Sequence, residues 1–323
     1  MGDIGVTVAA DPAERALDRL GDSAAVARAR AAMATLLEGV RSSCWPDIAW
    51  RFSRLTAPGC PVELSFCSAE PAFRYTVEVA GPEVDPAERL PLAERLLAAV
   101  APGSSLPSPL RAELNELQAA GALAWGAWIG ARHDARGSRY KLYAEVPRDA
   151  GAAAARMTEA HLGDASLLAQ RHPRFEGVGY EPATGQLELY YRLDGLDVWE
   201  TGVLLVHAGL GGRQSDLLEL MEDVYGRPMR PHLPRHQFGA SFTLAASGQP
   251  AAITLFSYAV DVFGTDARAR RALVTRLGLA GDDYARVSEP LADVETLPTH
   301  HTVVAFTALA QGAPALTVGL VPP

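Results

Sequence analysis

The sequence predicts an α+β fold: a ten-stranded antiparallel sheet closed into a barrel, with helices outside and a polar lumen. Pairs of strand-like segments recur along the 323 residues, and each pair is joined by a turn that contains Gly or Pro. Long stretches rich in Ala, Leu, Arg and Glu separate the pairs. Polar and apolar residues alternate within the strand-like segments, as they do in strands with one buried face.

The five predicted hairpins define one repeating unit. The paired segments are PVELSF with FRYTVEVA, ALAWGAWIGA with RYKLYAEVP, RFEGVGY with QLELYYRL, QFGASFTL with ITLFSYAV, and HTVVAFTAL with ALTVGLVP. The turns centre near residues 69, 135, 184, 248 and 312. Because the spacing of roughly 50 to 65 residues recurs, we interpret the chain as repeats of two helices and a hairpin.

The helical stretches complete each unit. We expect helices at about 12–40, 85–119 with a break at 102–109, 150–171, 196–226 and 265–292. Barrels of this size are commonly single domains, so we expect residues 1–323 to form one domain.

The alternation within the strands decides which face the helices cover. In KLYAEVP, Lys141, Tyr143 and Glu145 share one face and aliphatic residues share the other; QLELYY likewise places Gln186 and Glu188 opposite leucines. Helices pack on apolar faces, so the polar faces must lie on the other side of the sheet. A closed ten-stranded barrel would enclose them in a lumen and remove exposed edges. An open sheet with helices on one face and water on the other satisfies the same pattern.

Composition excludes several classes of function. The 29 Lys and Arg against 38 Asp and Glu leave a net charge of −9, so we expect no nucleic-acid partner and no membrane surface. No apolar run approaches the roughly 18 residues that a membrane-spanning helix requires. Three cysteines without metal-ligand spacing favour a reducing compartment, and we expect a cytoplasmic protein.

Short motifs resemble those of a known family, the ABBA-type aromatic prenyltransferases, and most closely the indole-prenylating dimethylallyltryptophan synthases. The similar elements are GCPVELS at 59–65, FRYTVE with Arg74, KLY at 141–143 and the final LTVGLVP. They follow the family's order across almost the whole chain. The resemblance implies a barrel of ααββ repeats that transfers a prenyl group from a prenyl diphosphate to an electron-rich aromatic ring.

The resemblance also implies roles for individual residues. By position, Arg74 and Lys141 would hold the diphosphate, Tyr143 and Tyr190 would shield the carbocation, and Glu63 would accept a proton or an N–H hydrogen bond from the aromatic ring. The alternative for Glu63 is a salt bridge to Arg74 or Lys141. The family needs no Asp-rich metal motif, so we expect no metal and no cofactor apart from prenyl diphosphate as co-substrate.

The chain departs from the family pattern at several of these positions. Gln186 and Glu188 stand where the family carries Arg and Lys, and a carboxylate there repels diphosphate. Phe256 replaces a tyrosine, and His301 and Gly319 stand where tyrosines are expected in the last hairpin. We keep Glu188, Phe256 and His301 as candidate substrate-binding residues. Glu188 has an alternative role as an ion-pair partner of Lys141.

Trp125 and Trp128 are further aromatic candidates. Their spacing of three places them on opposite faces of a regular strand, so we expect one to line the lumen and the other to be in the core.

Two functional hypotheses follow. The first is an aromatic prenyltransferase-like enzyme of secondary metabolism that acts on a small-molecule or small-peptide aromatic substrate such as an indole. The second is a barrel that has lost prenyl diphosphate binding and serves a biosynthetic pathway as a binding protein or as an enzyme of another reaction type. The residues at positions 186, 188, 256 and 319 motivate the second hypothesis.

Overall fold

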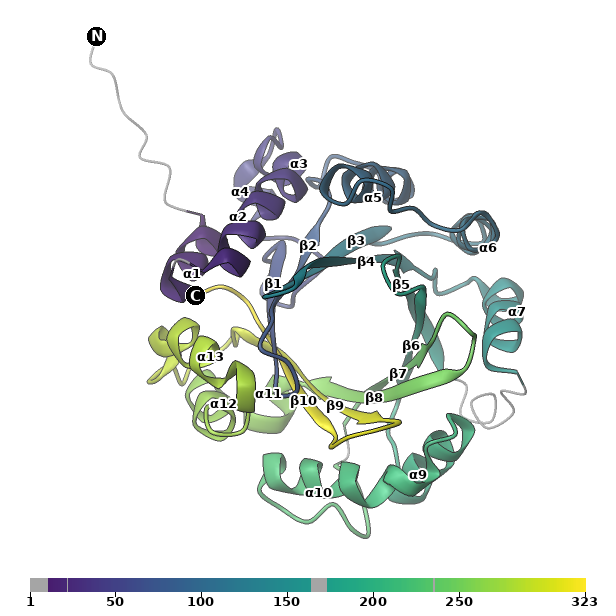
Figure 1. Cartoon of the computed structure of the whole chain (residues 1–323), viewed down its shortest axis with the longest axis vertical. Helices are drawn as coiled ribbons and strands as arrows, with labels where there is room; N and C mark the ends of the chain where they lie inside the picture. Colours follow the sequence, from purple (N-terminus) through teal and green to yellow (C-terminus); the bar gives the residue numbers. More distant parts are fainter. Residues whose placement is uncertain (1–10, 22, 164–172, 235) are drawn as a thin grey trace.

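Ten antiparallel strands form a closed barrel that is surrounded by helices (Figure 1). The computed structural model describes residues 11–21, 23–163, 173–234 and 236–323. The strands follow the order β1-β10-β9-β8-β7-β6-β5-β4-β3-β2 around the barrel. The strand bounds are β1 Val62–Cys67, β2 Phe73–Glu78, β3 Ala127–Asp134, β4 Gly137–Glu145, β5 Arg174–Glu181, β6 Gln186–Leu193, β7 Phe238–Leu244, β8 Pro250–Tyr258, β9 His301–Leu309 and β10 Ala315–Leu320.

The pairing of the first and last strands closes the barrel. Leu64 lies opposite Leu320 and Ser65 opposite Gly319, so no edge is left between β1 and β10. The predicted barrel is therefore confirmed, and the open-sheet alternative is wrong. All five predicted hairpins are present, and consecutive strands are neighbours throughout.

The helices lie outside the barrel, and most of them fall in the predicted segments (Figure 1). Their bounds are α1 Pro12–Leu20, α2 Ala24–Leu36, α3 Glu38–Arg41, α4 Pro46–Ala49, α5 Pro86–Val100, α6 Ser108–Ala119, α7 Gly151–Leu162, α9 Val198–His207, α10 Gln214–Tyr225, α11 Ala259–Phe263, α12 Asp266–Leu273 and α13 Gly281–Val287. The short helices α4 and α11 lie outside those segments. The end of the helix expected at 150–171 lies outside the described residues from position 164 onward.

Local sequence explains where the first helix begins and ends. The side chain of Asp11 accepts a hydrogen bond from the backbone N–H of Ala13 at 2.8 Å, and Pro12 occupies the first helical position. Gly21 ends α1 with a φ of 76°, which side chains with a Cβ rarely adopt. The expected helix at 12–40 is therefore divided into shorter helices.

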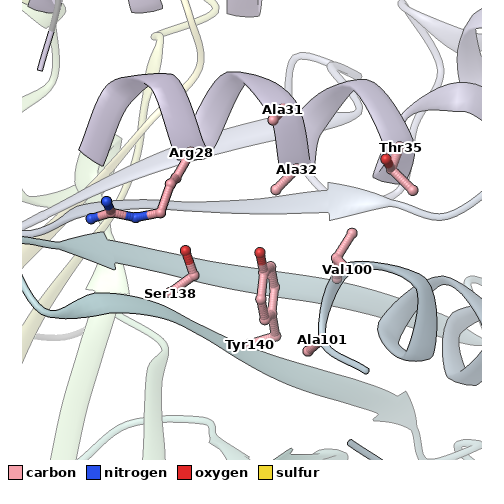
Figure 2. Close-up of a pocket in the computed structure, with 8 residues that line it drawn as sticks. All are labelled: Arg28, Ala31, Ala32, Thr35, Val100, Ala101, Ser138 and Tyr140. Carbon is pink, nitrogen blue, oxygen red and sulfur yellow. The ribbon is translucent and has the colours of Figure 1, made fainter. Parts of the chain in front are cut away.

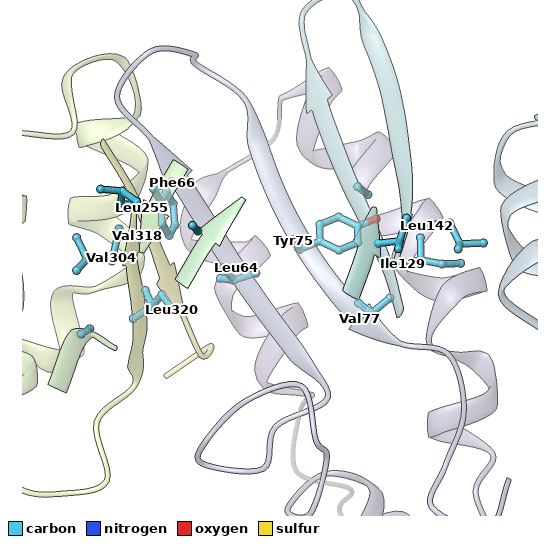
Figure 3. Packing of buried hydrophobic residues seen from close by; sticks show 14 of the residues in the cluster. Leu64, Phe66, Tyr75, Val77, Ile129, Leu142, Leu255, Val304, Val318 and Leu320 are labelled. Carbon is cyan, nitrogen blue, oxygen red and sulfur yellow. The ribbon is translucent and has the colours of Figure 1, made fainter. Parts of the chain in front are cut away.

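The hydrophobic core lies between the barrel and the helices. Outward-facing side chains such as Leu64, Val77, Ile129 and Leu142 are completely buried under the helical layer (Figure 3). The residues between them point into the barrel and remain partly exposed, so burial alternates along β1, β2 and β4. The strands thus present aliphatic faces to the helices and polar faces to a solvent-accessible interior.

Among the helices of the described residues, none is long and apolar enough to cross a membrane.

Candidate functional site

The interior face of the barrel gathers all but one of the candidate site residues. Strand alternation places them on the face opposite the core, on five different strands. The residues are Glu63 on β1, Arg74 on β2, Lys141 and Tyr143 on β4, Glu188 and Tyr190 on β6, and Phe256 on β8.

Glu63 is an interior carboxylate in an environment that favours its protonated form. Burial raises its pKa from the ordinary 4.5 to about 7, while the nearby hydroxyl of Thr302 acts in the opposite direction. No cation of the described residues forms an ion pair with Glu63, so the alternative of a salt bridge to Arg74 or Lys141 is absent from this structure. A carboxyl group with this pKa can take up and release a proton near neutral pH.

Gly319 provides the space that Glu63 occupies. A Cβ atom at position 319 would lie 2.9 Å from Glu63 Oε1 and 2.3 Å from Thr302 Oγ1. The glycine that replaces an expected tyrosine therefore has a steric role beside the carboxylate.

Lys141 and Glu188 form a hydrogen-bonded ion pair inside the barrel. The hydroxyl of Ser241 on β7 also donates to Glu188. Burial alone would lower the pKa of Lys141, but the adjacent carboxylate raises it; conversely, Lys141 lowers the pKa of Glu188 against the effect of burial. Both groups are therefore charged at neutral pH, as the ion-pair alternative for Glu188 predicted.

Three aromatic rings follow one another around the interior wall. The ring centroids of Tyr143 and Tyr190 are 5.9 Å apart, and those of Tyr190 and Phe256 are 6.5 Å apart. Lys141 Nζ lies 5.5 Å from the Tyr143 ring centroid, and the Arg192 guanidinium lies 5.5 Å from that of Phe256. These faces already attract cations, which is the property that stabilises a carbocation.

Glycines on the neighbouring strands let these rings lie against the wall. A Cβ at Gly239 would lie 2.0 Å from the ring of Phe256, its cross-strand partner. A Cβ at Gly130 would lie 2.9 Å from the Tyr143 ring. Sequence reasoning missed these glycines; the available signal was a glycine at an inward position on a strand beside one that carries an inward aromatic residue.

Each interior cation on the described strands contacts a carboxylate. The pairs are Arg74 with Glu70, Arg132 with Glu70 and Glu181, Arg139 with Glu181 and Asp134, Lys141 with Glu188, and Arg192 with Glu176. An anionic ligand entering the barrel must therefore compete with these carboxylates.

Trp125 and Trp128 stack on each other, which corrects the expectation that they lie on opposite faces. Their ring centroids are 3.7 Å apart and the planes are nearly parallel. Gly126, with a φ of 70°, interrupts the extended backbone between them, and β3 begins only at the next residue. The Glu145 carboxylate fixes this loop by accepting hydrogen bonds from the backbone N–H groups of residues 124–126.

His301 lies outside the barrel, so its predicted position among the substrate-binding residues is wrong. Its Nδ1 is 2.6 Å from Asp266 Oδ1, and its Nε2 is 2.9 Å from the hydroxyl of Tyr284 on α13. A register shift between Val318 and Leu320 on β10 changes the face on which His301 lies. The histidine joins the helical layer to the barrel.

A separate pocket of about 410 Å³ lies on the outer side of β4, beneath α2 and the end of α5 (Figure 2). Ser138 and Tyr140 point from β4 towards α2, and Arg28 lies at one end. Because β4 separates this pocket from the interior, it is not part of the candidate site.

In the parts of the chain that the structure describes, no group of three or more His, Cys, Asp or Glu residues is arranged to hold a metal ion.

Comparison with known proteins identifies the fold. The sequence matches no protein-family model, and no curated protein matches it. The 5-dimethylallyl tryptophan synthase of Streptomyces coelicolor, solved with DMASPP and Trp, is similar in structure with a TM-score of 0.73 and 17% identity, over 96% of this chain and 94% of that chain. The 6-dimethylallyltryptophan synthase of Micromonospora olivasterospora, also solved with DMASPP and Trp, has a TM-score of 0.73 and 19% identity, over 97% of both chains.

A third similar structure widens the comparison. AnaPT of Neosartorya fischeri has a TM-score of 0.67 and 16% identity, over 96% of this chain and 92% of that chain. The resemblance inferred from the short motifs is confirmed at the level of the fold, and this chain has the ten-stranded ABBA barrel of the aromatic prenyltransferases.

Proposed function

We propose that this chain is an aromatic prenyltransferase-like enzyme that transfers a prenyl group from a prenyl diphosphate to an indole or another electron-rich aromatic ring in secondary metabolism. The observation that carries the proposal is Glu63: a carboxyl group with a pKa of about 7, inside a barrel with the fold of dimethylallyltryptophan synthases. The odd number of cysteines favours a cytoplasmic location.

The proposed reaction uses the two kinds of surface inside the barrel. Cleavage of the allylic C–O bond leaves a diphosphate anion and a carbocation. The faces of Tyr143, Tyr190 and Phe256 stabilise the carbocation and keep water from it. A ring carbon of the acceptor then forms the new C–C bond, and Glu63 takes the proton that this carbon releases. Arg74 and the tyrosine hydroxyls would contact the diphosphate.

Mass spectrometry tests this proposal directly. The purified full-length chain is incubated with dimethylallyl or geranyl diphosphate and tryptophan-like acceptors, and a product heavier by one prenyl group is expected. Glu63→Gln should abolish the product without unfolding the protein, whereas Glu159→Gln, an exposed position on α7, should preserve it. Lack of product across a broad panel of donors and acceptors would contradict the proposal.

The second candidate is a barrel that no longer binds prenyl diphosphate and acts as a binding protein or as an enzyme of another reaction type. The observation in its favour is that Glu188 engages Lys141, and that each of the other interior cations described also contacts a carboxylate. Two unit charges about 4 Å apart interact by about 4 kcal/mol at an effective dielectric constant near 20. A diphosphate must offset a loss of this order to displace Glu188 from Lys141.

Calorimetry with a prenyl thiolodiphosphate, which resists cleavage, separates the two candidates. Micromolar binding would contradict the second candidate, and absence of binding would contradict the first. If binding is absent, the double variant Gln186→Arg with Glu188→Lys should recover it, because it replaces a neutral side chain and an anion with two cations. Failure of the double variant would refute the electrostatic explanation.

A further inference from the structure

The outer face of the barrel carries a cluster of polar side chains beneath α2. His133 on β3 is completely buried there, and its Nδ1 lies 2.8 Å from the hydroxyl oxygen of Ser138 on β4. Its Nε2 lies 3.2 Å from the hydroxyl oxygen of Tyr75 on β2. Tyr140 on β4 contacts the same imidazole edge to face, with ring centroids 5.9 Å apart. Sheet faces that helices cover are usually apolar, so this cluster needs a reason beyond packing.

The pocket of about 410 Å³ beneath α2 borders this cluster (Figure 2). Arg28 and Ser138 lie at one end of it, and Val100 and Ala101 lie at the other. Arg28 and Thr35 both line the pocket and are two turns of α2 apart, so it is about 10 Å long. Volumes of roughly 300–1,000 Å³ are typical of small-molecule sites. The pocket therefore suits a small molecule with a polar head and an apolar body.

Arg28 supplies a positive charge at the polar end. It forms no ion pair with any carboxylate of the described residues; its Nη2 donates to the backbone carbonyl of Asp134. Its Nε is buried and has no hydrogen-bond partner in the described parts of the chain. Burial, and then the charge of Arg28, lower the pKa of His133 to about 4, so the imidazole is neutral at pH 7. A buried N–H without an acceptor costs free energy, and a carboxylate would satisfy both this N–H and the charge.

The hydrogen-bond directions in the cluster identify a second donor. The hydroxyl of Tyr75 donates to a backbone carbonyl of α2 at 3.5 Å, so its oxygen accepts from Nε2 of His133. The neutral imidazole then accepts at Nδ1 from the hydroxyl of Ser138, which has no further proton to donate. The hydroxyl of Tyr140 points from β4 towards α2 in the same pocket (Figure 2). Arg28 and Tyr140 are therefore the groups that can donate to an anion.

We propose that this pocket binds a small aliphatic carboxylic acid, with its carboxylate at Arg28 and Tyr140 and its alkyl chain against Val100 and Ala101. The side chains that line the wall away from the polar end are mostly those of alanine and valine, which suits an unbranched chain. Such an acid provides an acceptor for the Nε of Arg28 and removes apolar surface from water. The site lies on the outer side of the barrel and does not depend on the proposed function.

Ligand-observed NMR titration of the full chain with hexanoate tests the site. We expect saturable binding of hexanoate, and binding of hexanamide that is about tenfold weaker, because the amide has a similar shape but no charge. Arg28→Gln and Tyr140→Phe should each weaken the binding of hexanoate about tenfold. Arg136→Gln removes an exposed arginine in the turn between β3 and β4 and should leave the affinity unchanged.

The length of the ligand provides an independent measurement. Each CH₂ group added between butanoate and hexanoate should increase the affinity about fourfold, because it buries further apolar surface. Thermal unfolding verifies that each variant is folded, and Arg28→Met is a second uncharged variant with the same expected loss.

Four results would overturn the proposal: no saturable binding of hexanoate, equal affinities for hexanoate and hexanamide, unchanged binding in both folded Arg28 variants, or equal affinities for butanoate and hexanoate. Binding that survives the loss of Arg28 would place the acid elsewhere, including the barrel interior. Formation of prenylated product is a separate measurement, so either result leaves the test of the proposed function unaffected.

Discussion

Replacing Glu63 should change how the stability of the protein depends on pH. The folded protein raises the pKa of this carboxyl group from 4.5 to about 7 because the barrel excludes most water from it. Between these pH values, the folded state retains a proton that the unfolded chain has released. The stabilisation from this proton is therefore present at low pH and is lost as the pH rises through about 7.

The expected magnitude follows from the two pKa values. At 1.36 kcal/mol per pKa unit, the complete loss is about 3 kcal/mol, of which about 2.5 kcal/mol falls between pH 5 and pH 8. Glutamine resembles the protonated carboxyl group and does not titrate. Relative to the natural protein, Glu63→Gln should therefore gain about 2.5 kcal/mol of stability between these pH values.

Urea unfolding of both proteins at several pH values from 5 to 8 measures this difference. Subtracting the two free energies of unfolding removes the effects of all other titrating groups, and Glu159→Gln serves as the exposed control. A difference between Glu63→Gln and the natural protein that stays constant with pH would refute the assigned environment of Glu63.

Three further predictions concern other parts of the fold. Gly319→Ala should lower the free energy of unfolding by about 1–3 kcal/mol, because its Cβ would lie 2.3 Å from Thr302 Oγ1; an unchanged urea midpoint would contradict this. Arg89→Met should lower the free energy of unfolding by about 3–5 kcal/mol, because it leaves the carboxylate of Glu78 buried without the cation 2.8 Å away. Equal melting temperatures of the variant and the natural protein would show that the pair is dispensable. Asp266 accepts hydrogen bonds from the backbones and rings of two consecutive histidines, and these bonds hold its pKa below the usual range despite burial. Asp266→Asn should therefore lower the free energy of unfolding by at least about 2 kcal/mol at pH 7. The difference from the natural protein should shrink as the pH falls below 3.8, because the natural protein loses stability there. Urea unfolding of both proteins at pH 7 and pH 3 measures this difference, and an equal difference at the two pH values would contradict the reasoning.

The errors of the sequence-based interpretation have a common physical origin in backbone irregularities. Side-chain alternation predicts a face only while the strand remains regular, and one extra residue reverses it. The register shift near the end of β10 turns His301 away from the interior. The positive φ of Gly126 brings Trp125 onto Trp128. Neither irregularity has a clear signal in the local hydrophobic pattern.

The sequence by itself determined the five hairpins, the helices between them and the polar faces of the regular strands. These features depend on residues close together in the chain: turn-forming glycines and prolines, helix propensity and the two-residue repeat of a strand. That is why the inward positions of Glu63, Arg74, Lys141 and Tyr143 were predictable.

Only the tertiary structure decided the closure of the barrel, the partners of the interior charges and the environment of Glu63. Lys141 and Glu188 are 47 residues apart in sequence, and Glu70 and Arg132 are 62 apart, yet each pair is in direct contact. Electrostatic interactions depend on distance in space and on exclusion of water. The strand order and the packing of the helices set both quantities, and no local pattern in the sequence contains them.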